Sequence, residues 1–122
     1  KLLMASYGKL KNSQISMKAK NDFVTELDKK SEALIISIIK KHYPDHAIQA
    51  EESGVSRGKK TVWIIDPLDG TSNYIHQIPL FSVSIAVYEE GAIQTGLILD
   101  PLHKELYTAE RGKGAFLNNL VK

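Results

Sequence analysis

Two aspartates stand three residues apart in the stretch IIDPLDGTSN, directly after the apolar run TVWII. The run predicts a short buried strand, so Asp66 falls where the strand leaves the core, and Pro67 fixes the backbone angle that follows. Asp69 precedes Gly70 and Thr71, a sequence suited to a tight turn that opens into a helix with Asp69 near its N-cap. Backbone amides at a helix start bind phosphate, because they point outward and the helix dipole is positive there.

A cation is needed if this turn is to bind an anion, because two carboxylates beside it repel a phosphate. Mg²⁺ prefers oxygen ligands in an octahedron at roughly 2.0–2.1 Å and commonly uses a few carboxylates together with water and substrate phosphate. The stretch therefore predicts a divalent-metal site that binds a phosphate group.

Three other interpretations of DPLDG compete with a metal site. An Asp-Pro pair alone is typical of a capped surface turn, and the pair that begins at Asp100 is expected to form one. An EF-hand calcium loop is excluded, because its third, sixth and twelfth positions counted from Asp66 would be Leu68, Thr71 and Gln77. Phosphatases of the haloacid dehalogenase type carry D-x-D-x-T after a strand. Two residues separate the aspartates here, so we exclude a covalent aspartyl mechanism.

The composition is that of an ordinary globular chain, with 122 residues, 43% hydrophobic and 25% charged, which allows one domain. A net charge of +2 without a basic block gives no sign of a direct nucleic-acid or membrane partner. The absence of cysteine excludes disulfides and thiolate metal sites and permits a reducing compartment. The run ALIISII is too short to span a bilayer, and KLLMASYGKL lacks a signal-peptide pattern. We therefore expect a soluble, cytoplasmic protein.

The elements that must position the aspartates follow from hydrophobic periodicity. Between Thr25 and about His42 the apolar residues recur at intervals of three and four, which predicts an amphipathic helix. Its apolar positions are Leu27, Leu34, Ile35, Ile38 and Ile39. A helix end is expected in KLLMASYGKLKN, and a strand in AIQAEES. Three further strands are expected in FSVSIAVYEEGAIQTGLILDPLHKELYTA, with turns at Gly91 and DPLHK. Connections this short cannot make parallel crossovers, so the fold class is α+β, with an antiparallel meander sheet packed on helices.

The remaining residues with chemical potential are assigned to the surface or the core. The histidines show no ligand spacing and are expected at the surface: His42, His46, His76 and His103. The large aromatic residues are expected in the core: Trp63, Tyr74 and Phe81.

Three motifs follow one another along the chain: KAKNDFVTELD from Lys18, EES from Glu51, and WIIDPLDGTSNY from Trp63. Together they resemble the inositol monophosphatase family, particularly its bacterial members known as extragenic suppressors. The resemblance continues through PLFSVSIAVYEEGAIQTGLILDPLHKELYTAERGKGAFLNN. It implies a layered α/β sandwich of the sugar-phosphatase type. It also implies a Mg²⁺-dependent phosphomonoesterase that hydrolyses inositol monophosphate by activated water, without a phosphoenzyme.

The resemblance further implies a set of metal ligands. Glu51 and Asp66 correspond to ligands of a first Mg²⁺, together with the backbone carbonyl of Leu68. Asp66 and Asp69 correspond to ligands of a second. Two or three Mg²⁺ ions are implied in all, and in sites of this type a pair lies about 3.5–4 Å apart.

Other positions correspond to the phosphate-binding and catalytic groups of the family. The phosphate-binding positions are Asp69, Gly70 and Thr71. Thr71, hydrogen-bonded to Asp28, and Glu51 correspond to the catalytic group that activates water. Asp28 also follows Thr25 by three residues, a spacing that fits simple helix capping. Outer contacts are implied for Glu52 and Lys18.

A further family motif, W-D-x-A-A-G, has no match in this chain. We therefore expect residues 1–122 to be the amino-terminal metal-binding half of such a phosphatase, inactive alone because the carboxy-terminal half is absent from this chain. At full length the resemblance implies a lithium-sensitive homodimer acting on a small phosphorylated polyol. Two alternatives stay open. One is a fructose-bisphosphatase or bisphosphate nucleotidase of the same superfamily, and the other is a non-catalytic role in transcription complexes through a protein partner.

Overall fold

The computed structural model describes residues 1–19, 22–56, 58–118 and 120–121, without the side chains of residues 18–19, 22–24, 59 and 120–121. The first elements are helix α1 (Leu2–Ser6), the 3₁₀ helix η1 (Asn12–Gln14), strands β1 (Ile15–Ala19) and β2 (Asp22–Thr25), and helix α2 (Glu26–His42). Next come β3 (His46–Ala50), β4 (Gly54–Ser56), β5 (Lys59–Asp69) and the short helix α3 (Thr71–Ile75). The last are β6 (Ser82–Glu89), β7 (Ala92–Asp100), β8 (Glu105–Glu110), β9 (Gly114–Leu117) and β10 (Leu120–Val121).

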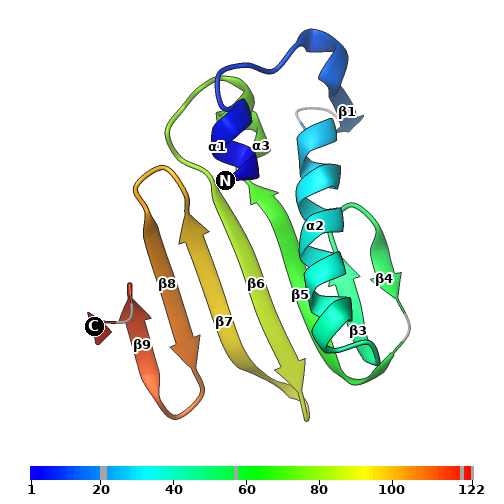
Figure 1. The fold of residues 1–122 in the computed structure, drawn as a ribbon, viewed down its shortest axis with the longest axis vertical. Helices are drawn as coiled ribbons and strands as arrows, with labels where there is room; N and C mark the ends of the chain where they lie inside the picture. The colour runs from blue at the N-terminus through cyan, green and yellow to red at the C-terminus, as the bar shows by residue number, and fades with distance from the viewer. Residues whose placement is uncertain (20–21, 57, 119, 122) are drawn as a thin grey trace.

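The main sheet has eight strands in the order β10-β9-β8-β7-β6-β5-β3-β4, and β1 pairs with β2 in a separate hairpin (Figure 1). The antiparallel meander expected over β6, β7 and β8 is confirmed, and β9 extends it. An additional feature is the parallel pair of β3 and β5. The chain returns through β4 on the outer side of β3, so it enters β5 in the direction of β3. The carboxyl ends of β3 and β5 therefore lie at the same edge of the sheet.

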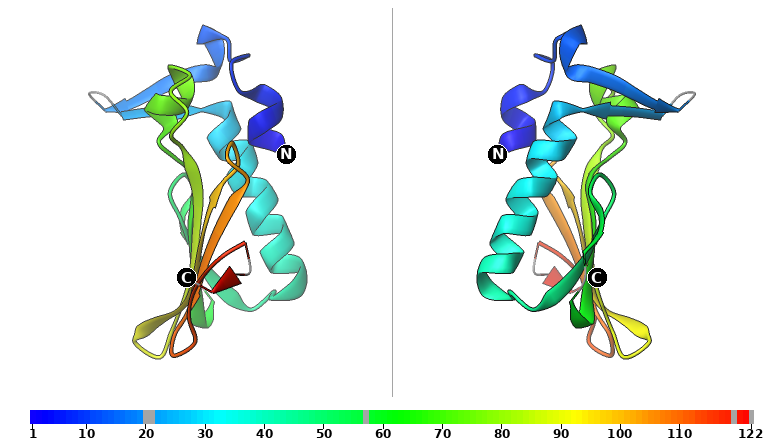
Figure 2. Two further views of the ribbon diagram at one scale, coloured as in Figure 1. Left: turned by 90° about the vertical axis from the view of Figure 1, so that its left-hand side faces the viewer. Right: turned by 90° about the vertical axis from the view of Figure 1, so that its right-hand side faces the viewer.

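Helices α1 and α2 lie on one side of the sheet, and among the described elements no helix covers most of its other face (Figure 2). Ile98 and Tyr107, which are paired neighbours on β7 and β8, are 48% and 43% exposed. Apolar side chains fill the space between α2 and the sheet. The buried members of that cluster are Ile39, Ile48, Ala50 and Ile65.

Helix α2 begins with a capping box. The Thr25 hydroxyl accepts hydrogen bonds from the amides of Leu27 and Asp28, and the Asp28 carboxylate accepts one from the Thr25 amide at 2.9 Å. Such reciprocal bonds satisfy amides that have no partner inside the helix. The helix boundary expected at Thr25 is thus set by local chemistry.

The buried face of α2 differs from the expected apolar stripe. Leu34 and Ile38 are 51% and 54% exposed, so their assignment to the buried face was wrong. The buried positions are Leu27, Asp28, Ser31, Glu32 and Ile39. The buried face differs from the apolar stripe because three polar side chains in the first two turns of α2 bind residues at or just after the ends of β3 and β5. They are Asp28, Ser31 and Glu32.

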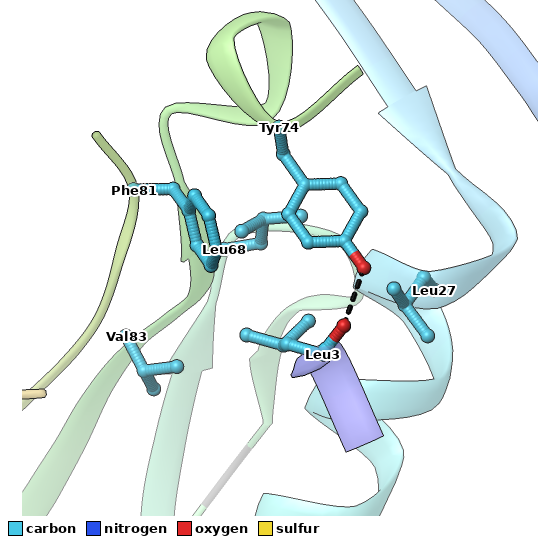
Figure 3. Packing of buried hydrophobic residues seen from close by; sticks show 6 residues of the cluster. All are labelled: Leu3, Leu27, Leu68, Tyr74, Phe81 and Val83. Carbon is cyan, nitrogen blue, oxygen red and sulfur yellow. Dashed lines mark hydrogen bonds between the residues drawn. The ribbon is translucent and has the colours of Figure 1, made fainter. Parts of the chain in front are cut away.

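A second cluster lies under α3 and combines side chains from α1, α2, β5 and β6 (Figure 3). Its buried members are Leu3, Leu27, Leu68, Tyr74, Phe81 and Val83. The Tyr74 hydroxyl donates a 2.6 Å hydrogen bond to the Leu3 carbonyl, drawn in Figure 3. Burial, with smaller contributions from Asp28 and Tyr7, raises the pKa of Tyr74 to about 12. This cluster anchors the segment between Asp66 and Asp69, because Leu68 is only 1% exposed.

Two assignments of side chains to core and surface are refined by the structure. Tyr74 and Phe81 are buried as expected, whereas Trp63 is half-buried at the edge of the sheet core. His46, expected at the surface, is partly buried. Its Nδ1 lies 3.0 Å from Nε1 of Trp63, which donates to it, and its ring stacks on that of Tyr43. In the described part of the chain, no helix combines the length and the apolar character needed to cross a membrane.

Candidate metal and phosphate site

The parallel pairing of β3 and β5 places two acidic residues side by side. Ala50 is paired with Ile65, and the next residues along the two strands are Glu51 and Asp66. The Glu51 amide donates a 3.1 Å hydrogen bond to the Ile65 carbonyl, so the parallel ladder continues one residue past β3. Glu51 and Asp66 are 15 positions apart in the sequence but lie side by side at one edge of the sheet, which we call the acidic edge.

Asp66 lies in an environment that disfavours its charged form. Its pKa is raised to about 7, first by burial and then by the hydrogen bond and charge of the adjacent Glu51 carboxyl. The Leu68 amide, which donates to Asp66 Oδ1 at 3.1 Å, opposes this shift, and the charge of Asp69 adds to it. Two close carboxyls of this kind are stabilised either by a shared proton or by a cation.

The turn after β5 depends on a glycine. Gly70 has a φ of 85°, and a Cβ atom at this position would lie 2.9 Å from the Leu80 carbonyl oxygen. Both the left-handed backbone and the close approach exclude a side chain. Gly70 is the N-cap of α3 without a side-chain cap, and Asp69 is the last residue of β5 immediately before it.

A buried carboxylate connects this turn to α2. The Thr71 hydroxyl lies 2.8 Å from Asp28 Oδ1 and 3.0 Å from the Leu68 carbonyl, across 43 residues of sequence in the first case. The other oxygen of Asp28 accepts from the amide and the hydroxyl of Thr25. Asp28 is 1% exposed. The two interpretations of Asp28 from the sequence, helix capping and a hydrogen bond with Thr71, are therefore compatible. One oxygen caps the helix and the other binds Thr71.

Two residues that hold the site were not found from the sequence. Ser31 Oγ donates a 3.3 Å hydrogen bond to the Pro67 carbonyl. Glu32 is 3% exposed, and its two carboxylate oxygens accept from the amides of Glu52 and Ser53 at 2.7 and 2.9 Å. With Asp28, these residues occupy positions i, i+3 and i+4 of α2, one face of the helix. Polar residues at this spacing directly after an acidic motif are the only sequence signal for such a role.

The oxygen donors at this edge fit a hard divalent cation such as Mg²⁺. The carboxyls of Glu51 and Asp66 are in contact. Asp69 follows at the end of β5, and Leu68, whose carbonyl is a further oxygen donor, lies between Asp66 and Asp69 in the sequence. Within the described residues, no group of three or more His, Asp or Glu side chains is arranged to hold a metal ion. Mg²⁺ commonly takes only a few protein carboxylates and keeps several waters. Glu52 is half-buried and fixed through its amide, whereas the side chain of Lys18 lies outside the described residues.

Comparison with known proteins agrees with this arrangement. The family model described as "Inositol monophosphatase family" matches residues 1–122. The protein named Nus factor SuhB from Pasteurella multocida is 46% identical over 121 residues, which are 98% of this chain and 45% of that protein. The Inositol-1-monophosphatase of Mesorhizobium japonicum is 44% identical over 119 residues, 96% of this chain and 45% of that protein. The chain thus spans about half the length of these curated relatives.

A solved structure shows the same fold. The extragenic suppressor protein suhB from Bartonella henselae superposes with a TM-score of 0.95 at 42% identity, covering 98% of this chain and 47% of that one. The expected layered arrangement of a sheet packed on helices is therefore confirmed, with a mixed sheet because β3 and β5 are parallel. Because the family model matches this chain from residue 1 to residue 122, the chain belongs to the inositol monophosphatase family.

Proposed function

We propose that this chain carries the metal-binding half of a Mg²⁺-dependent phosphomonoesterase that hydrolyses inositol monophosphate to inositol and phosphate. The observation that carries the proposal is the Thr71–Asp28 hydrogen bond beside the Glu51–Asp66 pair, since it joins a hydroxyl to a buried acceptor at an acidic edge. Membership of the family and a relative named Inositol-1-monophosphatase support the same activity.

The residues of this chain have distinct tasks in the proposed reaction. Mg²⁺, when held by Glu51, Asp66, the Leu68 carbonyl and Asp69, would neutralise phosphate charge and acidify water. When the Thr71 proton is donated to Asp28, the lone pairs of the Thr71 oxygen are left to accept a hydrogen bond from the attacking water. That bond orients the water toward phosphorus.

The proton and bond changes balance as follows. Glu51 accepts one proton from the water, whose oxygen forms a bond to phosphorus. The bond from phosphorus to the inositol oxygen breaks, and that oxygen takes up a proton from solvent. Charge neutralisation and in-line positioning are the main sources of rate acceleration in such reactions.

Phosphate binding is assigned to the turn that follows β5. The amides of Gly70 and Thr71 lie at the start of α3, where helix geometry leaves amides without intrahelical acceptors. Asp69 immediately precedes them, so its charge would repel a phosphate in the absence of a cation. Phosphate and divalent metal are therefore expected to bind cooperatively.

The test is phosphate release by the full-length protein that carries this chain. Inositol monophosphate, a fructose bisphosphate and a bisphosphate nucleotide would be compared at saturating Mg²⁺, with and without Li⁺. Preference for inositol monophosphate with inhibition by Li⁺ is the expected result. Preference for either other substrate would move the protein to another branch of the superfamily, and no release from any of them would refute the phosphatase proposal.

The second candidate function is a protein-interaction role in transcription complexes. The observation in its favour is the name Nus factor SuhB of the relative from Pasteurella multocida, at 46% identity. A Thr71→Ala variant separates the two candidates, since it is expected to lose hydrolysis and to retain any binding to a transcription protein. A full-length homodimer and a cytoplasmic location belong to the same set of proposals.

A further inference from the structure

Helix α2 reaches three segments of the site from a single face. Asp28 binds Thr71, Ser31 binds the Pro67 carbonyl, and Glu32 binds the turn after β3. The three contacts span 43, 36 and about 20 positions of sequence. The phosphatase proposal uses the first of them and gives Glu32 no task.

Glu32 makes the kind of contact that fixes a loop. Each of its oxygens accepts from one of two consecutive amides, those of Glu52 and Ser53, at 2.7 and 2.9 Å. Hydrogen bonds to an ionised acceptor are about twice as strong as neutral ones. Glu32 is 3% exposed, so water cannot easily replace it as the acceptor.

The same turn is fixed on its other side by the sheet. The Glu51 amide donates to the Ile65 carbonyl, the residue directly before Asp66. Three successive amides, at residues 51, 52 and 53, are therefore held by acceptors outside the turn. With the backbone fixed at and after Glu51, the direction of its side chain relative to Asp66 is restricted.

We propose that Glu32 is a positioning residue that holds the Glu51 carboxylate against Asp66 by binding the two amides that follow Glu51. This inference rests on the proposed function, in which Glu51 and Asp66 share a cation. In this proposal Glu32 itself would contact neither the cation nor the substrate. Residues that orient metal ligands typically change metal affinity by about 10- to 100-fold when they are replaced.

The experiment measures Mn²⁺ binding to the full-length protein by electron paramagnetic resonance, without substrate. Glu32→Gln keeps the size of the side chain but replaces one acceptor oxygen with a donor, and Glu32→Asp keeps the charge but shortens the reach. Both are expected to weaken Mn²⁺ binding by about 10- to 100-fold. Glu26→Gln is the matched control, because Glu26 lies on the same helix with its side chain 56% exposed in an ion pair with Lys30.

The two Glu32 variants separate position from charge. If the residue acted only through its negative charge, Glu32→Asp would bind Mn²⁺ like the wild type, and this result would overturn the proposal. Equal losses in Glu32→Gln and Glu26→Gln would overturn it as well. Weakened Mn²⁺ binding in both Glu32 variants supports it, even if the wild type releases no phosphate, in which case only the phosphatase proposal fails.

A second measurement does not depend on the variants folding. Hydrogen exchange of the wild-type amides of Glu52 and Ser53, followed by NMR, is expected to be at least about tenfold slower than that of the exposed turn residue Gly91. Exchange as fast as that of Gly91 would show that Glu32 does not hold the turn.

Discussion

The acidic edge and the β6–β9 meander are stabilised by contacts of different range. At the acidic edge, side chains of α2 bind segments about 20 to 43 positions away. In the turns of the meander, Asp100 binds the amides of Leu102 and His103, and Gln94 binds the carbonyl of Glu89, within five positions. The meander can therefore form from local sequence, whereas the acidic edge exists only when α2, β3 and β5 are packed together. Substitutions at the edge should change chemistry, and substitutions in the meander should have local effects.

The largest difference between the two regions is expected when an aspartate is neutralised in each. Asp66→Asn should lower kcat by about a thousandfold, because the proposed site would work by charge neutralisation and would lose a shared carboxylate. Asp100→Asn is the matched control and should stay within about twofold of wild type. Both would be measured as phosphate release by the full-length protein. Turnover like wild type in the Asp66 variant would remove the acidic edge from the reaction.

Thr71→Ala tests whether the hydroxyl acts on water and not on the cation. The expected loss in kcat is about a hundredfold, whereas Mn²⁺ affinity should change by less than about threefold because the metal ligands are untouched. Thr71→Ser should recover most of the rate, and Ser72→Ala, a change at the next and exposed residue, should have little effect. Loss of Mn²⁺ binding in proportion to the loss of rate would contradict this role.

Two glycines with nearly equal backbone angles compare the regions directly. Gly70 and Gly91 have φ values of 85° and 82°, but only at Gly70 would an added Cβ meet another atom, the Leu80 oxygen at 2.9 Å. Gly91→Ala should lower the free energy of unfolding by about 1 kcal/mol through backbone strain, and Gly70→Ala by about 2–3 kcal/mol through strain plus contact. Urea denaturation measures both. Equal losses would show that the contact at Gly70 relaxes without cost.

The smallest expected effect belongs to the ion pair in the meander turn. His103 Nδ1 lies 2.7 Å from Asp100 Oδ2, and this bond raises the pKa of His103 above its usual 6.5. Burial pushes the pKa of Asp100 upward, but the amide and ring of His103 and the Leu102 amide outweigh it, so that pKa lies below 3.8.

The sign of each shift defines the pH window of the pair. The ion pair is confined to the pH range between the lowered pKa of Asp100 and the raised pKa of His103, and any stability it adds is confined to that range. Asp100→Asn should lower the His103 pKa toward its usual value in an NMR titration, with only the smaller effect of Glu105 still raising it. No measurable change in unfolding is expected because His103 is exposed. An unchanged titration in the variant would show that the pair does not persist in solution.

The features that could be predicted from the sequence are those fixed by neighbouring residues. The start of α2 at Thr25 and the turn at Asp100 depend on side chains within a few positions. The meander pairs strands that follow one another directly in the sequence. The parallel pairing of β3 and β5 could not be predicted, because the register between Ala50 and Ile65 is set by packing. Glu32 was missed for a related reason. A charged helix residue is expected in solvent unless a buried hydrogen-bond partner for it is known. The donors to Glu32 are amides about 20 positions away in the sequence.

The candidate site was predicted as a list of residues but not as an arrangement. The structure brings together two pairs of the predicted residues, Glu51 with Asp66 and Asp28 with Thr71. All four were predicted from the resemblance of three motifs to the family. Their roles in binding metal and phosphate remain predictions, as does the division of the protein into two halves. No periodicity or composition argument could supply the contacts among them, since these contacts depend on how two strand ends and a helix meet.

In the proposed function, the two oxygens of Asp28 would couple the abundance of the protein to its turnover. One oxygen closes the first turn of α2 and the other receives Thr71, so any replacement changes both how much folded protein accumulates in a cell and how fast each molecule works. A mutational scan scored by abundance would classify Asp28 as structural, and a scan scored by growth that requires the product to be formed would classify it as catalytic. Only the ratio of the two scores would separate Asp28 from Thr71, which affects mainly the second.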